Sequence, residues 1–398
     1  MIIYIIFLIF LIALFLITYF FVKDEKKRHF LCSLIPAIGL FLMCGLKGAS
    51  VGADSMTYVN AYNDIASMPK FPNPQFFNEL NNFNFKNEYG FILTAVIFTN
   101  LNLPYLVFQL FIYAIISFCL FYAIWKMSKC AISSFLIFYC FNFFNFFLSG
   151  LRQSFAIALC LLAIAIISTG RKKVFKSILY FVLVAIATLW HKSAIIFIIP
   201  YFIINIKIEL KGFIVLLSLS LFLLIFGEQM YQVIYETSSI IFNTNGADYP
   251  PLSFGAGLTN ILFLFILIFC FFFYYPSNIK FKLINFIESK ISFYKKGECN
   301  NHNQTSTKMF SFFLLLSFVG LWLRYTNSYS VAFGRIAMYF TIFIIFLLPN
   351  ALENISNYRL KNSIKGILCV AFVAYFVYTF VLTNYLGVAP YNFIEGTL

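Results

Sequence analysis

Long apolar runs, separated by short polar segments, recur along the whole chain. Most runs hold about 15 to 22 residues with almost no charge, and a helix needs about 20 apolar residues to cross the hydrocarbon core of a bilayer. The pattern indicates an all-α polytopic membrane protein, with residues 1–398 forming a single integral-membrane domain. We predict about 12 transmembrane helices, at residues 2–22, 31–47, 104–125, 131–148, 153–169, 177–190, 193–206, 212–227, 257–275, 309–323, 335–350 and 364–386.

Residues 89–103 do not fit this series of crossings. They are apolar, but the stretch has only about 15 residues, which is short for a crossing, and it ends in polar Asn100 and Asn102 before Pro104. We interpret it as a short re-entrant or interfacial helix, because a further span here would invert one side of the topology. A full crossing at 89–103 is the alternative.

Composition supports this class and decides how the charge is interpreted. The chain is 62% hydrophobic and 11% charged, whereas soluble domains carry about 25% charged residues. A net charge of +14 would suggest nucleic acid in a soluble protein, but here the basic residues gather in short segments between apolar runs. This is the positive-inside pattern of a bacterial inner (cytoplasmic) membrane protein. We expect the lipid bilayer as a partner and no nucleic acid.

An even number of crossings places the basic clusters together on the cytoplasmic side. Two longer segments, residues 48–88 and 228–256, then face the periplasm or cell exterior, where long loops are candidates for substrate contact. The largest cytoplasmic loop, residues 276–308, is polar and receives no chemical role. Several cations on the outer side break the positive-inside rule, and such residues usually mark a functional site.

Arg152 is the clearest of these residues. The segment LRQSFAIALCLLAIAI places Arg152 and Gln153 at the start of a long apolar helix. An arginine fork binds phosphate through two hydrogen bonds, and a helix N-terminus adds its own positive field. We predict that Arg152 binds an anionic group at the outer face; an interfacial arginine that reaches lipid headgroups is the alternative.

His191 lies in the turn between two short apolar runs, flanked by Trp190 and Lys192. A histidine at this depth, beside a cation, can act as a general base on a hydroxyl or donate to a phosphate. A structural hydrogen bond is the alternative role. Arg324 and Arg335 flank a polar outer turn, and two such arginines can converge on one diphosphate; the alternative for each is interfacial anchoring.

The first outer segment supplies carboxylates. Asp54 and Tyr58 follow Gly52 just after a predicted membrane exit, and Glu88 precedes the short apolar stretch. A glycine-rich turn lets backbone amides approach a ligand, and Asp54 or Glu88 can accept a hydrogen bond from a sugar hydroxyl. The alternative is that both carboxylates are solvated loop residues.

Metal and nucleotide chemistry are not indicated. The chain has three histidines, and it contains no HExxH motif, no DxD motif and no GxxxxGK[ST] phosphate-binding loop. We expect no metal site and no cofactor.

Six segments, in their order along the chain, resemble the EpsG family of Wzy-type polysaccharide polymerases. They are VGADSMTY, NEYGF, LRQSFAIA with the basic RKK after it, LWHKSAIIFIIPYF, FGRIAMYF and APYNF. The most specific are the RQ pair at a helix start and the HxSA that follows a short helix. The resemblance runs from about residue 45 to the end of the sequence.

This resemblance implies a GT-C-like integral-membrane glycosyltransferase that joins repeat units of capsule, exopolysaccharide or O-antigen. It implies an undecaprenyl-diphosphate-linked oligosaccharide as donor and a lipid-linked sugar hydroxyl as acceptor at the periplasmic face. A chain-length regulator and a flippase are the implied protein partners. With the residue arguments above, we assign catalysis to His191, Arg152 and Asp54 and substrate binding to Gln153, Arg324, Arg335, Tyr339, Tyr58, Glu88, Lys192 and Ser193.

Four other functions stay open. An O-antigen ligase, or a glycosyltransferase that uses a polyprenyl-phosphate sugar, would need the same arginine and histidine chemistry. A lipid-oligosaccharide transporter would be expected to show repeated halves with broken helices that meet at the midplane. A membrane acyltransferase would need a histidine and an activated acyl donor.

Overall fold

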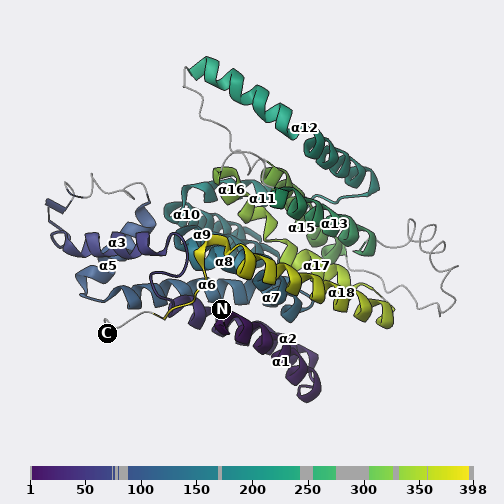
Figure 1. The fold of residues 1–398 in the computed structure, drawn as a ribbon, viewed down its shortest axis with the longest axis horizontal. Coiled ribbons are helices and arrows are strands. Elements are labelled where there is room, and N and C mark those ends of the chain that lie inside the picture. Colours follow the sequence, from purple (N-terminus) through teal and green to yellow (C-terminus); the bar gives the residue numbers. More distant parts are fainter. Residues whose placement is uncertain are drawn as a thin grey trace. The chain divides into compact units, whose positions relative to one another are not determined.

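The computed structural model describes residues 2–73, 75–76, 79, 88–168, 173–242, 254–274, 304–325, 331–355 and 357–393. Within these ranges every regular element is a helix (Figure 1), as expected for apolar segments that must satisfy their backbone hydrogen bonds internally. The chain divides into two compact units, one with Met1–Tyr201 and Gly366–Leu398 and one with Phe202–Lys365. The first unit is therefore built from two segments that are far apart in the sequence.

The first unit contains long helices and several short ones. In chain order they are α1 (Ile2–Phe21), α2 (Glu25–Gly45), α3 (Ser55–Ser67), α5 (Tyr89–Asn100), α6 (Tyr105–Met127), α7 (Ala131–Cys140), α8 (Phe143–Ser149), α9 (Leu151–Ser168), α10 (Lys173–Trp190), the 3-10 helix η1 (Lys192–Phe197) and α11 (Ile198–Ile203). The chain returns to this unit within α18 (Tyr358–Val377), followed by the π-helical turn η2 (Tyr378–Leu382) and η3 (Tyr385–Gly387).

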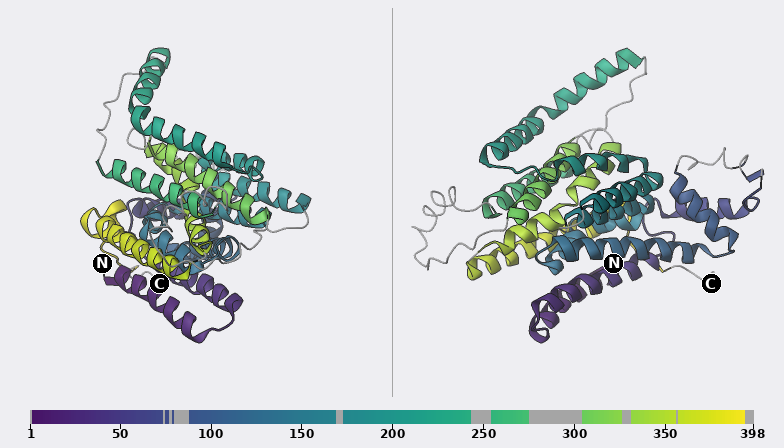
Figure 2. Two further views of the ribbon diagram at one scale, coloured as in Figure 1. Left: turned by 90° about the vertical axis from the view of Figure 1, so that its right-hand side faces the viewer. Right: turned by 180° about the vertical axis from the view of Figure 1, so that it is seen from behind.

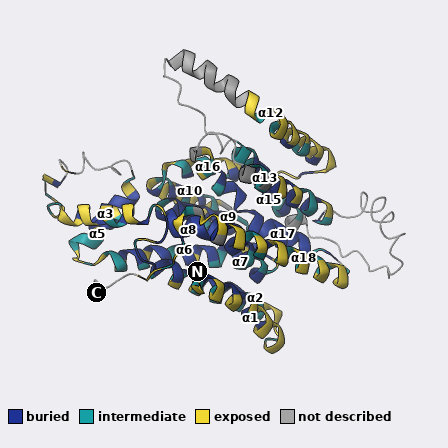
Figure 3. Cartoon of the chain, in the orientation of Figure 1, coloured by how far each residue is buried: buried dark blue, intermediate teal, exposed yellow. Residues whose placement is uncertain are grey.

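Helix α9 forms the core of this unit, packed against α6 and α10. Its buried positions include Ala156, Ala158 and Ala163, and small side chains let neighbouring helices approach closely. Helix α1 differs from α9: it forms a hairpin with α2 (Figure 2) and has many exposed positions (Figure 3). The exposed residues of α1 include Ile6, Ile9 and other large apolar residues. Exposed apolar side chains on a helix of this length suit contact with lipid tails.

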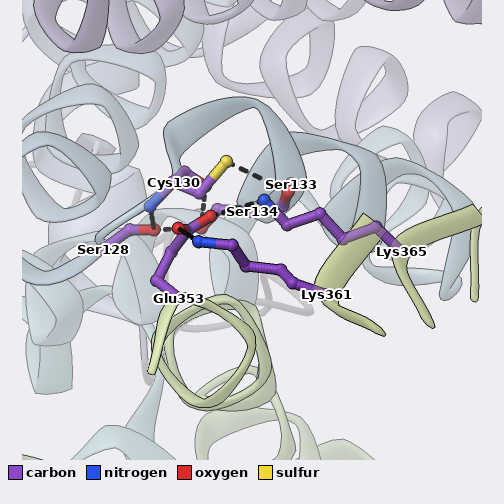
Figure 4. Close-up of polar contacts among 7 residues, drawn as sticks. All are labelled: Ser128, Cys130, Ser133, Ser134, Glu353, Lys361 and Lys365. Carbon is purple, nitrogen blue, oxygen red and sulfur yellow. Dashed lines mark hydrogen bonds and ion pairs between the residues drawn. The ribbon is translucent and has the colours of Figure 1, made fainter. Parts of the chain in front are cut away.

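The run 131–148, predicted as one span, is two helices. Ser128 lies just before the first of these helices, and its hydroxyl oxygen accepts hydrogen bonds from the Cys130 amide (3.1 Å) and the Ser134 hydroxyl (2.7 Å), as Figure 4 shows. At Asn142 the backbone turns left-handed (φ 67°), a conformation that asparagine adopts more readily than most residues, and α8 leaves α7 at 64°. The bend places Ser149, the last residue of α8, just before the start of α9.

Residues 386–393, here called the C-terminal brace, form backbone hydrogen bonds with the loop that follows α2. The amide of Gly48 donates to the Asn392 carbonyl (2.7 Å), that of Gly52 to Gly387 (3.0 Å), and that of Ala53 to Leu386 (2.8 Å). Backbone hydrogen bonds thus link a loop near the beginning of the chain to a segment near its end. The APYNF motif of the sequence lies within this brace.

The second unit contains α12 (Leu210–Phe242), α13 (Phe254–Tyr274), α15 (Gln304–Tyr325), α16 (Val331–Thr341), α17 (Ile344–Glu353) and the first part of α18. Helix α15 packs against α16 at Gly320, where an added Cβ atom would lie 2.6 Å from the Thr341 amide nitrogen. Glu353, at the end of α17, accepts hydrogen bonds from Lys361 (3.1 Å) and from Lys365 on α18 (Figure 4).

The helices agree with the predicted apolar runs. Among the described residues, eight helices are long and apolar enough to cross a membrane, or nine if the bent α7 and α8 pair is one span. Four shorter apolar helices coincide with the runs at 89–103, 177–190, 193–206 and 257–275. The chain is therefore a multi-pass, all-helical membrane protein. The count of 12 spans, the GT-C-like fold and the single domain stay predictions, and parts of the loops 48–88, 228–256 and 276–308 lie outside the described residues.

Candidate active site

Arg152 lies in the first turn of α9, as predicted, and α9 begins shortly after the end of α8. Its side chain is only 13% exposed, and its Nη1 donates to the Oε2 atom of Glu88. The guanidinium carbon also lies 5.4 Å from the ring centre of Tyr58 on α3, which is cation–π distance. Arg152 is thus surrounded by an anionic and an aromatic partner within the first unit.

His191 lies at the break between α10 and η1, as predicted from the turn between two short runs. Its backbone is extended (φ −154°), and its amide donates to the Ala187 carbonyl (2.9 Å), which ends α10. The ring is 18% exposed, and its Nδ1 atom lies 3.4 Å from Oε1 of Glu88. A single carboxylate therefore contacts both Arg152 and His191.

Glu88 reaches these two residues because α5 lies very close to α10. Glu88 is the N-cap residue of α5, and Gly90 faces Trp190, the last residue of α10. A Cβ atom at residue 90 would lie 2.4 Å from Cδ1 of the Trp190 indole, so only glycine permits this approach. The indole is fixed in turn by Phe155 of α9, with ring centres 4.1 Å apart.

Asp54 and Tyr58 enter the same part of the first unit through α3. The Asp54 amide donates to the Ser149 hydroxyl (3.2 Å), which places the start of α3 beside the end of α8. Gly52, with φ 96°, makes this possible, since a Cβ there would lie 2.8 Å from the Ser149 Cα. The side chain of Asp54 is half-buried, and that of Tyr58 is buried.

The remaining sequence candidates in this unit differ in exposure. Gln153 is buried in α9 beside Arg152. Lys192 is exposed and Ser193 is half-buried, both in the first turn of η1. Gln153 thus follows Arg152 directly in the sequence, and Lys192 and Ser193 follow His191.

Lys47 is a residue that the sequence reasoning missed. It follows α2 directly and is 3% exposed, and its Nζ donates to the Val51 carbonyl (3.1 Å) and to the Ser55 hydroxyl. Burial lowers the pKa of Lys47 from 10.5 to about 8. The signal in the sequence was a single lysine at the end of the predicted span 31–47, a position at which lysine usually extends to water; the structure ends the helix at Gly45 and places Lys47 beyond it.

The second unit holds the other three candidates. Arg324, at the end of α15, donates from Nε to Asn260 (3.0 Å) and from Nη2 to Thr259 (3.1 Å) of α13. Arg335 is exposed on α16, and Tyr339 on the same helix is fully buried. The turn between the two arginines, residues 326–330, lies outside the described residues, so their convergence on one diphosphate stays a prediction.

In the first unit the chemistry is that of an anion-binding cation beside a group that can take a proton. The arginine can grip two oxygens of a phosphate, and the imidazole can accept a proton from a hydroxyl. The side chains of Arg152, His191 and Glu88 are largely shielded from water, which strengthens the electrostatic interactions among them. Within the described ranges, no three His, Cys, Asp or Glu side chains lie together in a way that could hold a metal ion.

Comparison with known protein families gives a match over most of the chain. The model of the EpsG family covers residues 30–393, which is nearly the whole chain. No curated protein and no solved structure matches this chain.

Proposed function

Because this chain belongs to the EpsG family, we propose that it is a Wzy-like polysaccharide polymerase that extends a surface glycan by transferring it between lipid carriers. The donor is a glycan on undecaprenyl diphosphate, and the acceptor is a sugar hydroxyl of a second lipid-linked repeat unit. The reaction takes place at the periplasmic face of the inner membrane. Family membership supports a polymerase role in general, and the substrates and the membrane face are our proposal.

The observation that carries this proposal is the meeting of Arg152 and His191 at one carboxylate. The two residues come from the start of α9 and the end of α10, so the sequence alone did not require them to share a partner. Glycosyl transfer from a lipid diphosphate needs a cation for the leaving group and a base for the incoming hydroxyl. Arg152 and His191 supply both.

The proposed step can be written with atoms in balance. The acceptor oxygen forms a bond to the anomeric carbon of the donor glycan while the bond from that carbon to the diphosphate oxygen breaks. The proton of the acceptor hydroxyl passes to His191, and the negative charge that develops on the leaving diphosphate is stabilised by Arg152. No nucleotide is required, because the diphosphate is itself the leaving group.

Other predicted residues have supporting roles in this scheme. Asp54 or Glu88 would be the base if His191 is not, and Tyr58, Gln153, Lys192 and Ser193 would contact donor or acceptor. Arg324, Arg335 and Tyr339 of the second unit are proposed to bind substrate. A flippase would supply the lipid-linked units at the outer face, and a chain-length regulator would set when extension stops.

The test is extension by purified protein in liposomes. With only undecaprenyl-diphosphate-linked repeat units and no nucleotide, the wild-type protein should produce a ladder of lipid-linked glycans on a gel. The same preparation should be tested with a lipid core acceptor, with a polyprenyl-phosphate sugar and with an acyl donor. Transfer to one of these, without a ladder, would assign the chain to the ligase, single-sugar or acyl-transfer class instead.

A further inference from the structure

Glu88 contacts its two partners unequally. Its Oε2 atom accepts a hydrogen bond from Nη1 of Arg152, whereas its Oε1 atom lies 3.4 Å from Nδ1 of His191, beyond the usual hydrogen-bond range. The His191 Nδ1 atom is buried and forms no hydrogen bond with any residue in the described part of the chain. The structure thus shows the carboxylate engaged with the arginine and close to, but not bonded to, the imidazole.

A buried ring nitrogen without a hydrogen bond costs free energy, so a small shift of Glu88 toward His191 would be favourable if Arg152 released it. A diphosphate carries more negative charge than a carboxylate and accepts two parallel hydrogen bonds from an arginine fork. The proposed donor would therefore compete with Glu88 for the guanidinium. Tyr58 lies 5.4 Å from the guanidinium carbon and is an aromatic partner for the cation during this exchange.

We propose that Glu88 is a positioning residue that couples capture of the donor diphosphate by Arg152 to activation of His191; this rests on the function proposed above. When the diphosphate takes Arg152, Glu88 accepts a hydrogen bond from Nδ1–H of His191. That bond fixes the tautomer in which Nε2 carries the lone pair, and it stabilises the imidazolium that forms when the hydroxyl proton is taken. The base is then ready only when donor is bound, which protects the site from reaction without a donor.

The groups around His191 are compatible with this role. The 3-10 helix η1 packs against α10 and α9, and Arg152 is the charged residue at the facing end of α9. On α10 the ionisable residues Lys176 and Tyr180 precede His191 by ten residues or more, which is about 15 Å along a helix. Lys192, next to His191, is exposed. Glu88 is therefore the carboxylate in contact with the ring.

The first experiment observes the ring directly and does not need turnover. The chain has three histidines, so ¹⁵N-histidine NMR in nanodiscs is tractable, with single substitutions of His29 and His302 to assign the signals. Saturating inorganic pyrophosphate should move the Nδ1 signal of His191 toward a hydrogen-bonded position in the wild type and leave it unmoved in Glu88→Gln. Glu79→Gln, an exposed carboxylate of the same loop, should respond like the wild type.

The outcomes are distinguishable. A wild-type protein that binds pyrophosphate, measured by calorimetry, with no change at His191 would overturn the coupling and leave the proposed function in place. A protein whose pyrophosphate binding is absent, or is unchanged in Arg152→Lys, would overturn the diphosphate clamp and with it the coupling. A His191 response that persists in Glu88→Gln would show that another group acts on the ring.

The second experiment separates binding from extension. Glu88→Gln should bind lipid-linked donor at least as tightly as the wild type, because Arg152 no longer has to leave a carboxylate. Its extension rate with donor saturating should fall by about 100-fold, and the acid limb of its pH–rate profile should move to lower pH. Glu88→Asp should restore part of the rate. A loss confined to donor affinity, with an unchanged saturated rate and pH profile, would make Glu88 a structural partner of Arg152 and overturn the inference.

Discussion

Gly90 lies so close to Trp190 that the first atom of any side chain at residue 90 would enter the indole ring, at 2.4 Å from Cδ1. This approach brings Glu88, two residues earlier in the chain, to Arg152 and His191. The position of the carboxylate therefore depends on a glycine that has no chemistry of its own.

Gly90→Ala should separate α5 from α10. Overpacking of this kind costs about 1–3 kcal/mol, and the displacement of Glu88 should lower glycan extension by at least about 10-fold, because small errors in the position of catalytic groups have large effects on rate. Gly366→Ala is the matched control, since among the described residues no side chain and no other helix comes within 4 Å of a Cβ there. Gel ladders and thermal unfolding in detergent provide the two measurements. A variant with wild-type activity would show that the contact with Trp190 does not position Glu88.

Arg152→Lys keeps the positive charge but removes the planar fork. If Arg152 grips two oxygens of a diphosphate, the variant should remain severely impaired in donor binding and extension, by about 10-fold or more. An arginine that only reaches lipid headgroups would tolerate the change. Arg359→Lys, an exposed arginine on α18, controls for the substitution itself. The readouts are lipid-linked donor binding and the polymer ladder, at protein levels matched by blot.

His191→Ala removes the proposed base and leaves Arg152 in place. Donor lipid should still bind, whereas extension should fall by about 100-fold to 10,000-fold, the range of general-base loss. The comparison to make is the ratio of bound donor to polymer formed. Equal losses of binding and extension would place His191 in donor recognition instead of proton transfer.

Lys47 predicts a pH dependence of stability. Its pKa is about 8 in the folded protein and 10.5 in the unfolded chain, so the unfolded state holds the extra proton between these values, and stability must rise with pH through this window. The buried charge of Lys47 therefore lowers the free energy of unfolding by about 3 kcal/mol below pH 8, and this effect is absent above pH 10.5. Lys47→Met should lack this rise. Unfolding midpoints of both proteins at pH 7 and pH 10 test it, and parallel curves would contradict it.

Chelation should leave the reaction intact. If arginines take the place that a divalent cation holds in enzymes with nucleotide-sugar donors, as proposed above, extension in EDTA should match extension in buffer alone. Activity that disappears with EDTA and returns with Mg²⁺ or Mn²⁺ would mean that Asp54 and a neighbouring acid hold a metal.

Part of this site could be predicted from the sequence, because helix ends are local features. The apolar runs predicted the helices, and Arg152 and His191 follow from single charged residues at the ends of such runs. Glu88 was predicted as a site residue, but its contact with both Arg152 and His191 could not be predicted, since that contact depends on the approach of α5 to α10 through Gly90. Periodicity reports which residues are apolar and carries no information on which helices meet.

Two further features escaped prediction for related reasons. The bend at Asn142 turns an apparently continuous run into two helices, and an asparagine among phenylalanines is a weak signal for a left-handed residue. The burial of Lys47 depends on its place in a folded loop, to which the C-terminal brace pairs through the bridge of Lys47 with Phe393. Short sequence segments taken one at a time do not reveal contacts between such distant parts of a chain.

The C-terminal brace also sets an order of events during synthesis. Residues 386–393 leave the ribosome after every helix of the second unit has been made, yet the amides of Gly48, Gly52 and Ala53 depend on them for partners. The helices of the first unit from α1 to η1 can enter the membrane early in translation, but the loop that carries Asp54 cannot take its final form until translation has passed residue 393. Arg152 and His191 are therefore synthesised long before the residues that pair with the loop of Asp54, and that loop gains its backbone partners only when residues 386–393 fold back onto it.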